Sequence, residues 1–484
     1  MFDIIVVLAA LGLLIFLAFR GITLILLAPG VAMLAALGTG GLPLLAGYTQ
    51  VFMARTGDFI VAFFPLFLLG AIFGKLMDDS GCARSIAQSV SARLGAERAI
   101  VSIVLCCTVL TYGGVSAFVV AFAIFPVAAA LFRTADIPKR LIPGAVALGA
   151  FSFTMSALPG TPAIQNAIPM PFFSTTAFAA PGLGIIAAVI MFALGIAWLN
   201  RRAAWARAQG EGYGAHADSL PAADVVLREH ALGKGFDLNE LQETGANVEA
   251  LPPFALAVLP VLAVIVTNFV FVQFVVPAMD TSYLADPLFG ETTIERVRGV
   301  WAVIVALLLA ILLLIVTNWR RLTDLRESLD KGADASVLPI FNTASLVGFG
   351  AVIAALPVFD RISEAVLSIG GSNPLVSVSA SVATLSAMTG SASGGMTIAL
   401  DALGSTFVEL AQASGVSLEA MHRVTALASG TLDVLPHSGA VITLLTVCQI
   451  SHRDSYLDIF VVSMLGPIVS LVAVILIASL FGSF

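Results

Sequence analysis

The chain has 484 residues, of which 59% are hydrophobic and 11% are charged, and its mean hydropathy is +1.02. These values exclude a water-soluble globular protein and predict an all-α polytopic membrane protein. The net charge of −7 includes no basic tract, which argues against nucleic acid as a partner and against a polybasic lipid-binding patch. A lipid bilayer is therefore the expected environment.

Ten apolar segments are long enough to cross that bilayer as helices. The first lies at the N-terminus, which lacks the positive leader and the small-residue cleavage site of a signal peptide. The shortest segments have 16 residues, or about 24 Å of helix, so their ends should extend further. Polar stretches at 41–56 and 319–334 are predicted as separate helices on the membrane surface. The predicted crossings are 4–19, 22–37, 59–77, 141–174, 184–199, 254–276, 300–316, 337–358, 421–450 and 457–480.

Two further apolar runs, 100–132 and 375–410, are interrupted at their centres by glycine and hydroxyl residues. Each run is either two short crossings or one re-entrant hairpin. Arginine and lysine flank the first run on both sides, and these residues collect in the cytoplasm, so the run should return to the side from which it entered. Two hairpins and ten crossings put 18 of the 23 lysines and arginines on one side. That side is the predicted cytoplasmic side, with both termini outside.

The chain also contains an internal repeat. A shift of 277 positions gives matches that include Phe64 on Phe341, Gly113 on Gly390 and Pro159 on Pro436. Each half then has five crossings and one hairpin, and because five is odd the second half enters from the opposite face. We therefore predict two repeats of inverted topology, 1–199 and 254–484, joined by a cytoplasmic linker at 200–253.

Each repeat contains a long apolar run that cannot be one continuous helix. The run 141–174 contains "ALPGTPAIQN" from residue 157, and the run 421–450 contains "LPHSGAV" from residue 435. Proline and glycine break a helix and free backbone groups that hydrocarbon cannot solvate, so a break must line protein or water. Inverted symmetry brings both breaks and both hairpin tips toward the bilayer midplane, which predicts a binding site there.

The candidate substrate-binding residues are the small and polar residues of these four elements. Helix N-termini present free N–H groups and a positive dipole end, which suits an anion even without arginine. For any one glycine or serine taken singly, close packing between helices is the alternative. The set comprises Thr111, Gly113, Gly114, Ser116, Gly160, Thr161, Gln165 and Asn166 in the first repeat, and Thr389, Gly390, Ser391, Ser393, Gly394, Thr431 and Ser438 in the second.

Asp433 and His437 lie in the second break, and their counterparts in the first are Ser156 and Gly160. Ionisable groups at membrane depth are costly and mark ion or substrate pathways, and an unperturbed histidine titrates near neutral pH. We therefore predict that Asp433 or His437 carries a coupling proton. The alternatives are a pair that satisfies backbone groups freed by the break, and a pair that lies closer to the surface.

The cysteines do not suggest a metal site. Cys82, Cys106, Cys107 and Cys448 have no Cys-x-x-Cys or Cys/His spacing, and the adjacent pair is expected to pack as small side chains. We expect no disulfide, no metal and no cofactor.

The chain contains the motifs "LTYGGVSAFVVAFAIFP", "ALPGTPAIQNAIP", "MTGSASGGMTIALDALG" and "SGTLDVLPHSGAVITLL". They resemble the gluconate permease family of proton symporters, within the larger ion transporter superfamily, and the resemblance covers nearly the whole chain. It implies inverted repeats with hairpins, a scaffold that forms a homodimer, and a mobile domain that works as an elevator in the bacterial inner membrane. Members of that family carry gluconate, other sugar acids, citrate or hydroxybutyrate, usually with protons.

Together these features predict a secondary transporter that imports a small organic acid, such as a sugar acid or hydroxy acid, by proton symport. No lysine or arginine falls in either break or tip, which favours a monocarboxylate over a trianion. A sodium-coupled carrier of citrate-like acids is the alternative, because hairpin carbonyls can bind a hard cation. An intramembrane enzyme is disfavoured because the chain has no HExxH or GxSxG motif. A channel is disfavoured because one inverted pair of breaks suits a carrier better.

Overall fold

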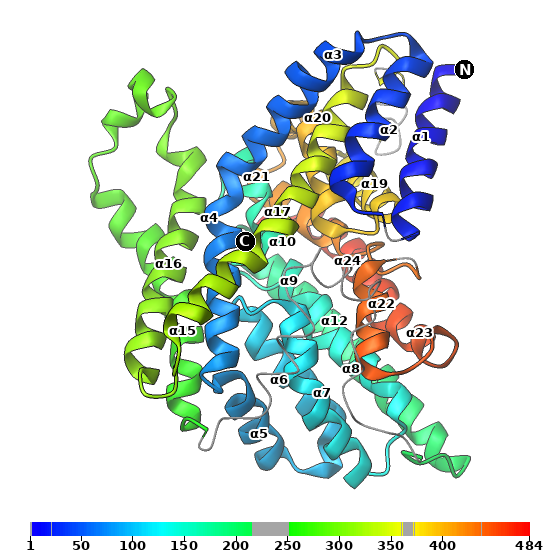
Figure 1. The fold of residues 1–484 in the computed structure, drawn as a ribbon, viewed down its shortest axis with the longest axis vertical. Coiled ribbons are helices and arrows are strands. Elements are labelled where there is room, and N and C mark those ends of the chain that lie inside the picture. The colour runs from blue at the N-terminus through cyan, green and yellow to red at the C-terminus, as the bar shows by residue number, and fades with distance from the viewer. Residues whose placement is uncertain are drawn as a thin grey trace.

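The computed structural model describes residues 2–20, 22–214, 251–359, 361, 371, 373–436 and 438–484. Every regular element in these residues is a helix (Figure 1). Six helical rods in the described part are long and apolar enough to cross a membrane, so the chain is a polytopic membrane protein, as its composition predicts. The rods are Leu44–Asp79, Pro181–Ala208, Phe254–Ala278, Ile294–Asn318, Leu325–Ala354 and His452–Phe481.

The rods contain most of the long helices. The first consists of α3 (Leu44–Ala46), a π-helical turn and α4 (Met53–Asp79). The others contain α12 (Pro181–Ala208), α15 (Phe254–Val270), α16 (Ile294–Asn318), α17 (Leu325–Ala354), and α23 (His452–Phe460) with α24 (Gly466–Phe481). The remaining helices are α1 (Phe2–Phe19), α2 (Leu24–Thr39), α5 (Cys82–Leu94), α6 (Ala99–Tyr112), α7 (Ala117–Thr134), α8 (Ile142–Val146), α9 (Phe153–Ser156), α10 (Ile164–Ala167), α11 (Pro169–Phe173), α19 (Pro374–Thr389), α20 (Ala392–Ala413), α21 (Leu418–Ser429) and α22 (Gly439–Cys448).

Both predicted hairpins are pairs of helices that pack against each other. In the first, α6 and α7 are joined by residues 113–116, and in the second, α19 and α20 are joined by Gly390 and Ser391. Figure 1 shows α6 and α7 in the lower part of the molecule and α19 and α20 in the upper part. Their re-entrant course relative to a bilayer stays a prediction.

Both predicted helix breaks are present. The first lies between the end of α9 at Ser156 and the start of α10 at Ile164, and the second lies between α21 and α22 at residues 430–438. The first run has further interruptions that the sequence did not predict, including one at Ser152, where φ is −117° and ψ is −110°. The run 141–174 is therefore a chain of short helices.

The predicted surface helices at 41–56 and 319–334 are not separate from the apolar helices that follow them. The stretch 41–56 is no separate surface helix, because α3 and the π-helical turn run on into α4, and α17 starts at Leu325 and likewise continues without a break. The helix α12 extends to Ala208, past the predicted start of the linker at residue 200. In each case polar residues near the end of an apolar helix add turns to it, because backbone hydrogen bonds continue once the helix is nucleated. The remainder of the linker, 215–250, lies outside the described residues.

The helices fall in matching order in the two halves. A shift of 277 positions lays α4 over α17, α6 over α19 and α7 over α20, and it lays the first break over the second. The opposite membrane orientation of the two halves stays a prediction.

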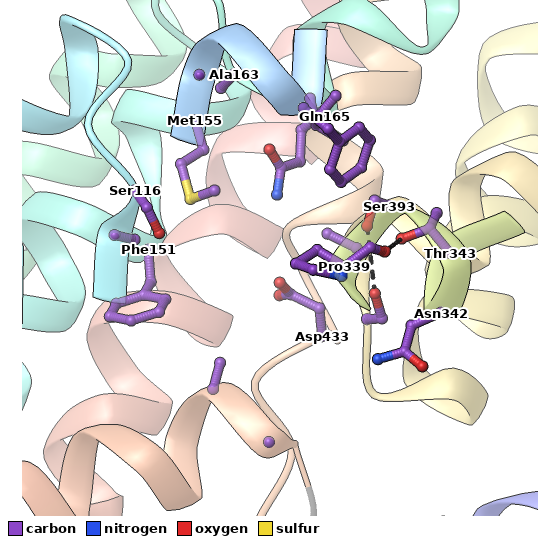
Figure 2. Close-up of a pocket in the computed structure, with 18 of the residues that line it drawn as sticks. Ser116, Phe151, Met155, Ala163, Gln165, Pro339, Asn342, Thr343, Ser393 and Asp433 are labelled. Carbon is purple, nitrogen blue, oxygen red and sulfur yellow. Dashed lines mark hydrogen bonds between the residues drawn. The ribbon is translucent and has the colours of Figure 1, made fainter. Parts of the chain in front are cut away.

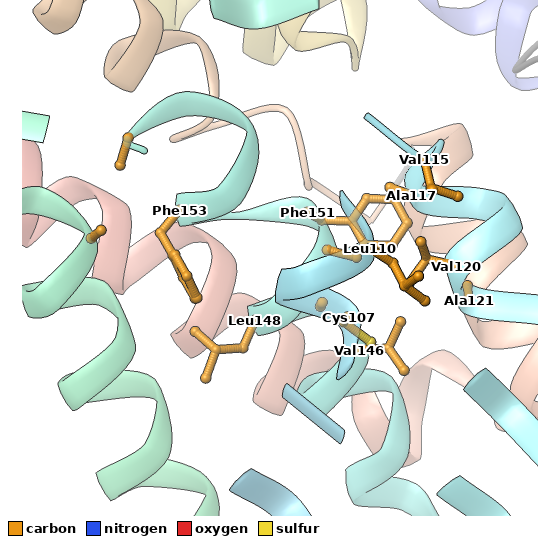
Figure 3. Close-up of a cluster of buried hydrophobic side chains, with 14 of the residues drawn as sticks. Cys107, Leu110, Val115, Ala117, Val120, Ala121, Val146, Leu148, Phe151 and Phe153 are labelled. Carbon is orange, nitrogen blue, oxygen red and sulfur yellow. The ribbon is translucent and has the colours of Figure 1, made fainter. Parts of the chain in front are cut away.

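A continuous apolar core holds the first hairpin against the segment that leads into the first break. Figure 3 shows Cys107 and Leu110 of α6, Val120 of α7 and Phe151 packed together, and all four are buried. Gly149 makes this packing possible, because a Cβ there would collide with the carbonyl of Val104. Cys106 and Cys107 are buried in this core, as expected for small packing side chains, and all four cysteines are buried free thiols.

Candidate functional site

The four irregular elements of the two repeats meet at one cavity of about 820 Å³. Both hairpin tips and both breaks contribute to its wall, together with α4, the start of α2 and the middle of α17. Figure 2 shows Gln165 of the first repeat and Asp433 of the second directed into this same space. The volume is in the range of small-molecule sites. The structure therefore brings together residues that lie more than 300 positions apart in the chain.

The second tip and the second break form one connected wall. The backbone N–H of Gly394 donates to the Ser391 hydroxyl over 3.2 Å, so Ser391 caps the N-terminus of α20. The hydroxyl of Ser438, in the break, donates to the carbonyl of Gly390 over 3.2 Å. Thr389 and Ser393 complete this wall, and Gly390 takes the left-handed conformation with φ of 61° that ends α19.

The first tip and the first break are also joined. The hydroxyl of Tyr112 donates to the carbonyl of Pro159 over 2.7 Å. Thr111, Gly114, Ser116 and Gln165 all line the cavity, as predicted. The Thr111 Oγ1 and Gln165 Oε1 atoms are buried and have no hydrogen-bond partner in the described part of the chain. Unpaired buried polar groups are costly, so these two atoms are available for a bound molecule.

Five predicted residues lie behind the cavity wall. Gly113 packs against Val261 of α15, and Gly394 packs against Leu346 of α17. Thr431 donates to the carbonyl of Ala428 within its own chain turn. The other two, Gly160 and Thr161, belong to the folded loop of the first break, where the Gly160 N–H donates to the carbonyl of Ala177. Packing or local hydrogen bonding explains all five.

Asn166 is also structural in this geometry. Its side chain is fully buried, and its Nδ2 donates to the carbonyls of Thr161 (3.0 Å) and Ala177 (2.9 Å). These two bonds fix the orientation of the amide, so Oδ1 faces the other way and accepts hydrogen bonds. Asn166 therefore holds the loop closed, while its neighbour Gln165 faces the cavity.

Asp433 contributes the charged side chain of the cavity. Among the described residues of the wall, no lysine or arginine is present and Asp433 is the one ionisable group. Its carboxylate points into the space between the two repeats (Figure 2). His437 lies outside the described residues.

The sequence analysis missed two buried side chains of α21, His422 and Arg423. The His422 Nε2 lies 3.2 Å from the Asn166 Oδ1, and its Nδ1 lies 2.6 Å from the Thr175 Oγ1. Because Asn166 accepts with Oδ1, Nε2 carries the proton and the Nδ1 of a neutral imidazole accepts from the Thr175 hydroxyl. His422 thus ties α21 to the first break.

Arg423 binds the same loop with all of its donors. Its Nη1 donates to the Ser156 carbonyl (3.2 Å) and to the Asn166 Oδ1 (3.1 Å), and its Nε and Nη2 donate to the carbonyls of Ala179 and Ala177. A His-Arg pair inside the apolar run 421–450 was a visible signal, since ionisable residues in membrane helices are functional candidates. The sequence analysis did not include this pair because Arg423 lies seven positions before the second break and its hydrogen-bond partners belong to the first break.

No protein-family model matches the chain. A curated relative does: the chain is 43% identical over 487 residues to a protein named uncharacterized transporter YxjC from Bacillus subtilis (strain 168). The aligned region covers 99% of each chain. The similarity therefore includes both repeats, both breaks and every element of the cavity.

Proposed function

Because the chain belongs to the same transporter family as the Bacillus subtilis protein YxjC, we propose that it is a secondary active transporter that imports a small organic acid together with protons. The proposal places the protein in the inner membrane of a bacterium, as a homodimer that works by an elevator movement. The substrate is a small monocarboxylate that carries hydroxyl groups, such as a sugar acid or a hydroxy acid.

One observation carries the proposal: a cavity of about 820 Å³ with a single acid in its described wall lies where both tips and both breaks meet. Hydroxyl and amide groups line part of the space, including Ser116, Gln165, Thr389 and Ser393. They can bond substrate hydroxyls and one carboxylate. A trianion would lack the cations needed to offset its burial, because no lysine or arginine is present in the described wall.

Asp433 provides a simple physical route to coupling. Two negative charges in one cavity repel each other, so binding of an organic anion and protonation of Asp433 favour each other. A loaded carrier would then hold one proton and one anion at this site. An empty carrier would release the proton on the side where its concentration is lower. His437, predicted to share this role, lies outside the described residues.

Alternating access would use the two tips as gates. Each tip is hydrogen-bonded to its own break, through Tyr112 in the first repeat and Ser438 in the second. A twofold-related pair of such units offers two conformations of similar energy, which a carrier requires in order to face each side in turn.

Uptake into proteoliposomes tests this function. Labelled gluconate, 3-hydroxybutyrate, lactate and citrate would be offered under an imposed proton gradient, with and without sodium. We expect one monocarboxylate to accumulate with the proton gradient, and we expect Asp433→Asn to lower accumulation by at least tenfold while exchange across the membrane continues. Thr431→Val, which changes a hydroxyl behind the wall, is the matched control.

Two results would reject the proposal. Accumulation that requires sodium and ignores the Asp433→Asn change would favour the sodium-coupled alternative. Flux far above carrier rates without any gradient coupling would favour a channel.

A further inference from the structure

Arg423 is a fully buried cation whose described partners are all neutral. Its guanidinium donates five hydrogen bonds, and each acceptor is a backbone carbonyl or the amide oxygen of Asn166. No ion pair to a carboxylate joins Arg423 in the part of the chain that the structure describes. The hydrogen bonds satisfy its donors, but they leave its positive charge uncompensated.

Such a charge is expensive for a membrane protein. Burial of an unpaired ion costs several kcal/mol even after relaxation, and a neutral side chain such as glutamine could bond some of these acceptors at lower cost. At the matching position of the first repeat, 277 residues earlier, the chain has Val146. The fold therefore does not require a cation at this place in its repeat, which indicates that the charge has a use.

The charge lies directly behind the cavity wall. The Ser156 carbonyl, which accepts from Nη1 over 3.2 Å, belongs to a residue that lines the cavity. Gly430, at the end of the helix that carries Arg423, also lines it. Little water can screen a charge in this position, so its potential extends through the wall into the cavity.

We propose that Arg423 supplies the positive potential that holds the substrate carboxylate against the first break, beside the unpartnered hydroxyl of Thr111. This inference rests on the proposed function, since it requires the substrate to be an anion. It also orients that substrate: the carboxylate faces the first repeat, and the remainder of the molecule faces Asp433 and the hydroxyls of the second tip. Arg423 acts through the wall and is a positioning residue.

The test compares an acid with its neutral amide. The probes are the acid with the highest uptake in the panel above (gluconate, 3-hydroxybutyrate, lactate or citrate) and its primary amide, and binding to purified full-length protein is measured by calorimetry. For Arg423→Gln we expect the dissociation constant of the acid to rise roughly tenfold and that of the amide to change less than twofold. Arg423→Lys, which keeps the charge but has fewer donors, should stay closer to wild type for the acid.

A second variant compensates the charge of Arg423 through its partner Asn166. Asn166 does not line the cavity, and its Oδ1 lies 3.1 Å from Arg423 Nη1, so Asn166→Asp gives the guanidinium a carboxylate partner. The variant also loses the two hydrogen bonds that Nδ2 donates to the carbonyls of Thr161 and Ala177, so its melting temperature is measured first. The folded Asn166→Asp protein should weaken binding of the acid more than binding of the amide, which tests the charge independently of Arg423→Gln. His422→Gln is the control, because it changes the neighbouring hydrogen bonds without changing charge, and it should leave the ratio of acid to amide affinity unchanged.

The inference is wrong if folded Arg423→Gln, checked by its melting temperature, binds the acid as wild type does. It is also wrong if either charge-changing variant raises the dissociation constants of the acid and the amide by the same factor. That result would mean that the residue affects the shape of the cavity wall and not its electrostatic potential. If wild-type protein binds and transports none of the acids, the proposed function itself fails.

Discussion

The two helix breaks occupy matching places in the repeat, yet they are built in opposite ways. The first is a closed loop in which Asn166 and the guanidinium of Arg423 bond the carbonyls that the break sets free. The second contains Asp433 and is fastened to its tip by Ser438. The first break therefore supplies a hydrogen-bonded wall of the cavity, and the second supplies a wall with a titratable group.

Two exchanges of residue account for the difference. Ser156 in the first repeat corresponds to Asp433 in the second, and Val146 corresponds to Arg423. Both charged residues come from the second repeat, but α21 extends Arg423 across to the first break. The asymmetry of the site thus arises from one helix that serves both breaks, since it contacts the first and ends where the second begins.

In the first break, substitutions at the neighbouring residues Asn166 and Gln165 should have different effects: one should lower the stability of the protein and the other should weaken substrate binding. Asn166→Ala removes the contacts to two carbonyls and leaves His422 Nε2 without its acceptor, so we expect a loss of about 3 kcal/mol, seen as a lower melting temperature in detergent. Gln165→Ala removes a side chain whose Oε1 has no partner, so it should change stability by less than about 1 kcal/mol and weaken substrate binding instead. Equal destabilisation by both variants would contradict the assignment of Asn166 to the structure of the loop and of Gln165 to the cavity wall.

The contact between the first tip and the first break should tolerate no side chain at Gly114. This residue has φ of +95°, and an added Cβ would lie 2.8 Å from Pro162 Cγ. We expect Gly114→Ala to destabilise the protein by about 1–2 kcal/mol through strain and to slow transport, measured by melting temperature and initial uptake rate. Gly70→Ala is the matched control, because Gly70 also lines the cavity and an added Cβ would meet nothing within 4 Å. An unaffected Gly114→Ala protein would show that tip and break need no close approach.

The smallest expected effect concerns a charge pair far from the breaks. Arg140 Nε lies 2.7 Å from Glu211 Oε1, and this hydrogen bond lowers the pKa of Glu211. The pair therefore stabilises the folded state above the unfolded pKa of about 4.3, and that contribution is lost as pH falls through the lower folded pKa. Because Glu211 is partly exposed, the contribution is under about 1 kcal/mol.

This pair makes Glu211→Gln a control for the pH dependence of transport. The variant should melt at a slightly lower temperature at pH 7, and that difference should shrink below pH 4, while the pH profile of uptake stays that of wild type. A displaced uptake profile would mean that the coupling proton is not confined to the cavity.

The sequence by itself determined the class of the protein and the position of its irregular elements. Apolar runs of sufficient length predict membrane helices, and the prolines and glycines near Ala157 and Leu435 predict breaks, because these residues act on the local backbone. The repeat made the tips and breaks recognisable as a set. Pattern reasoning placed helix ends less well, as the continuous rod at Leu44–Asp79 shows, since helix propagation depends on more than local polarity.

Only the tertiary structure decided which side chains face the cavity and which hold its wall. Gln165 and Asn166 are neighbours of similar chemistry, yet one lines the cavity and the other is fully buried in hydrogen bonds. The sequence could not assign Arg423 to the first break, because its hydrogen-bond partners lie 244 to 267 positions away in the chain. The physical reason is that a residue type fixes what bonds a side chain can make, whereas the partner depends on which helices pack together in space.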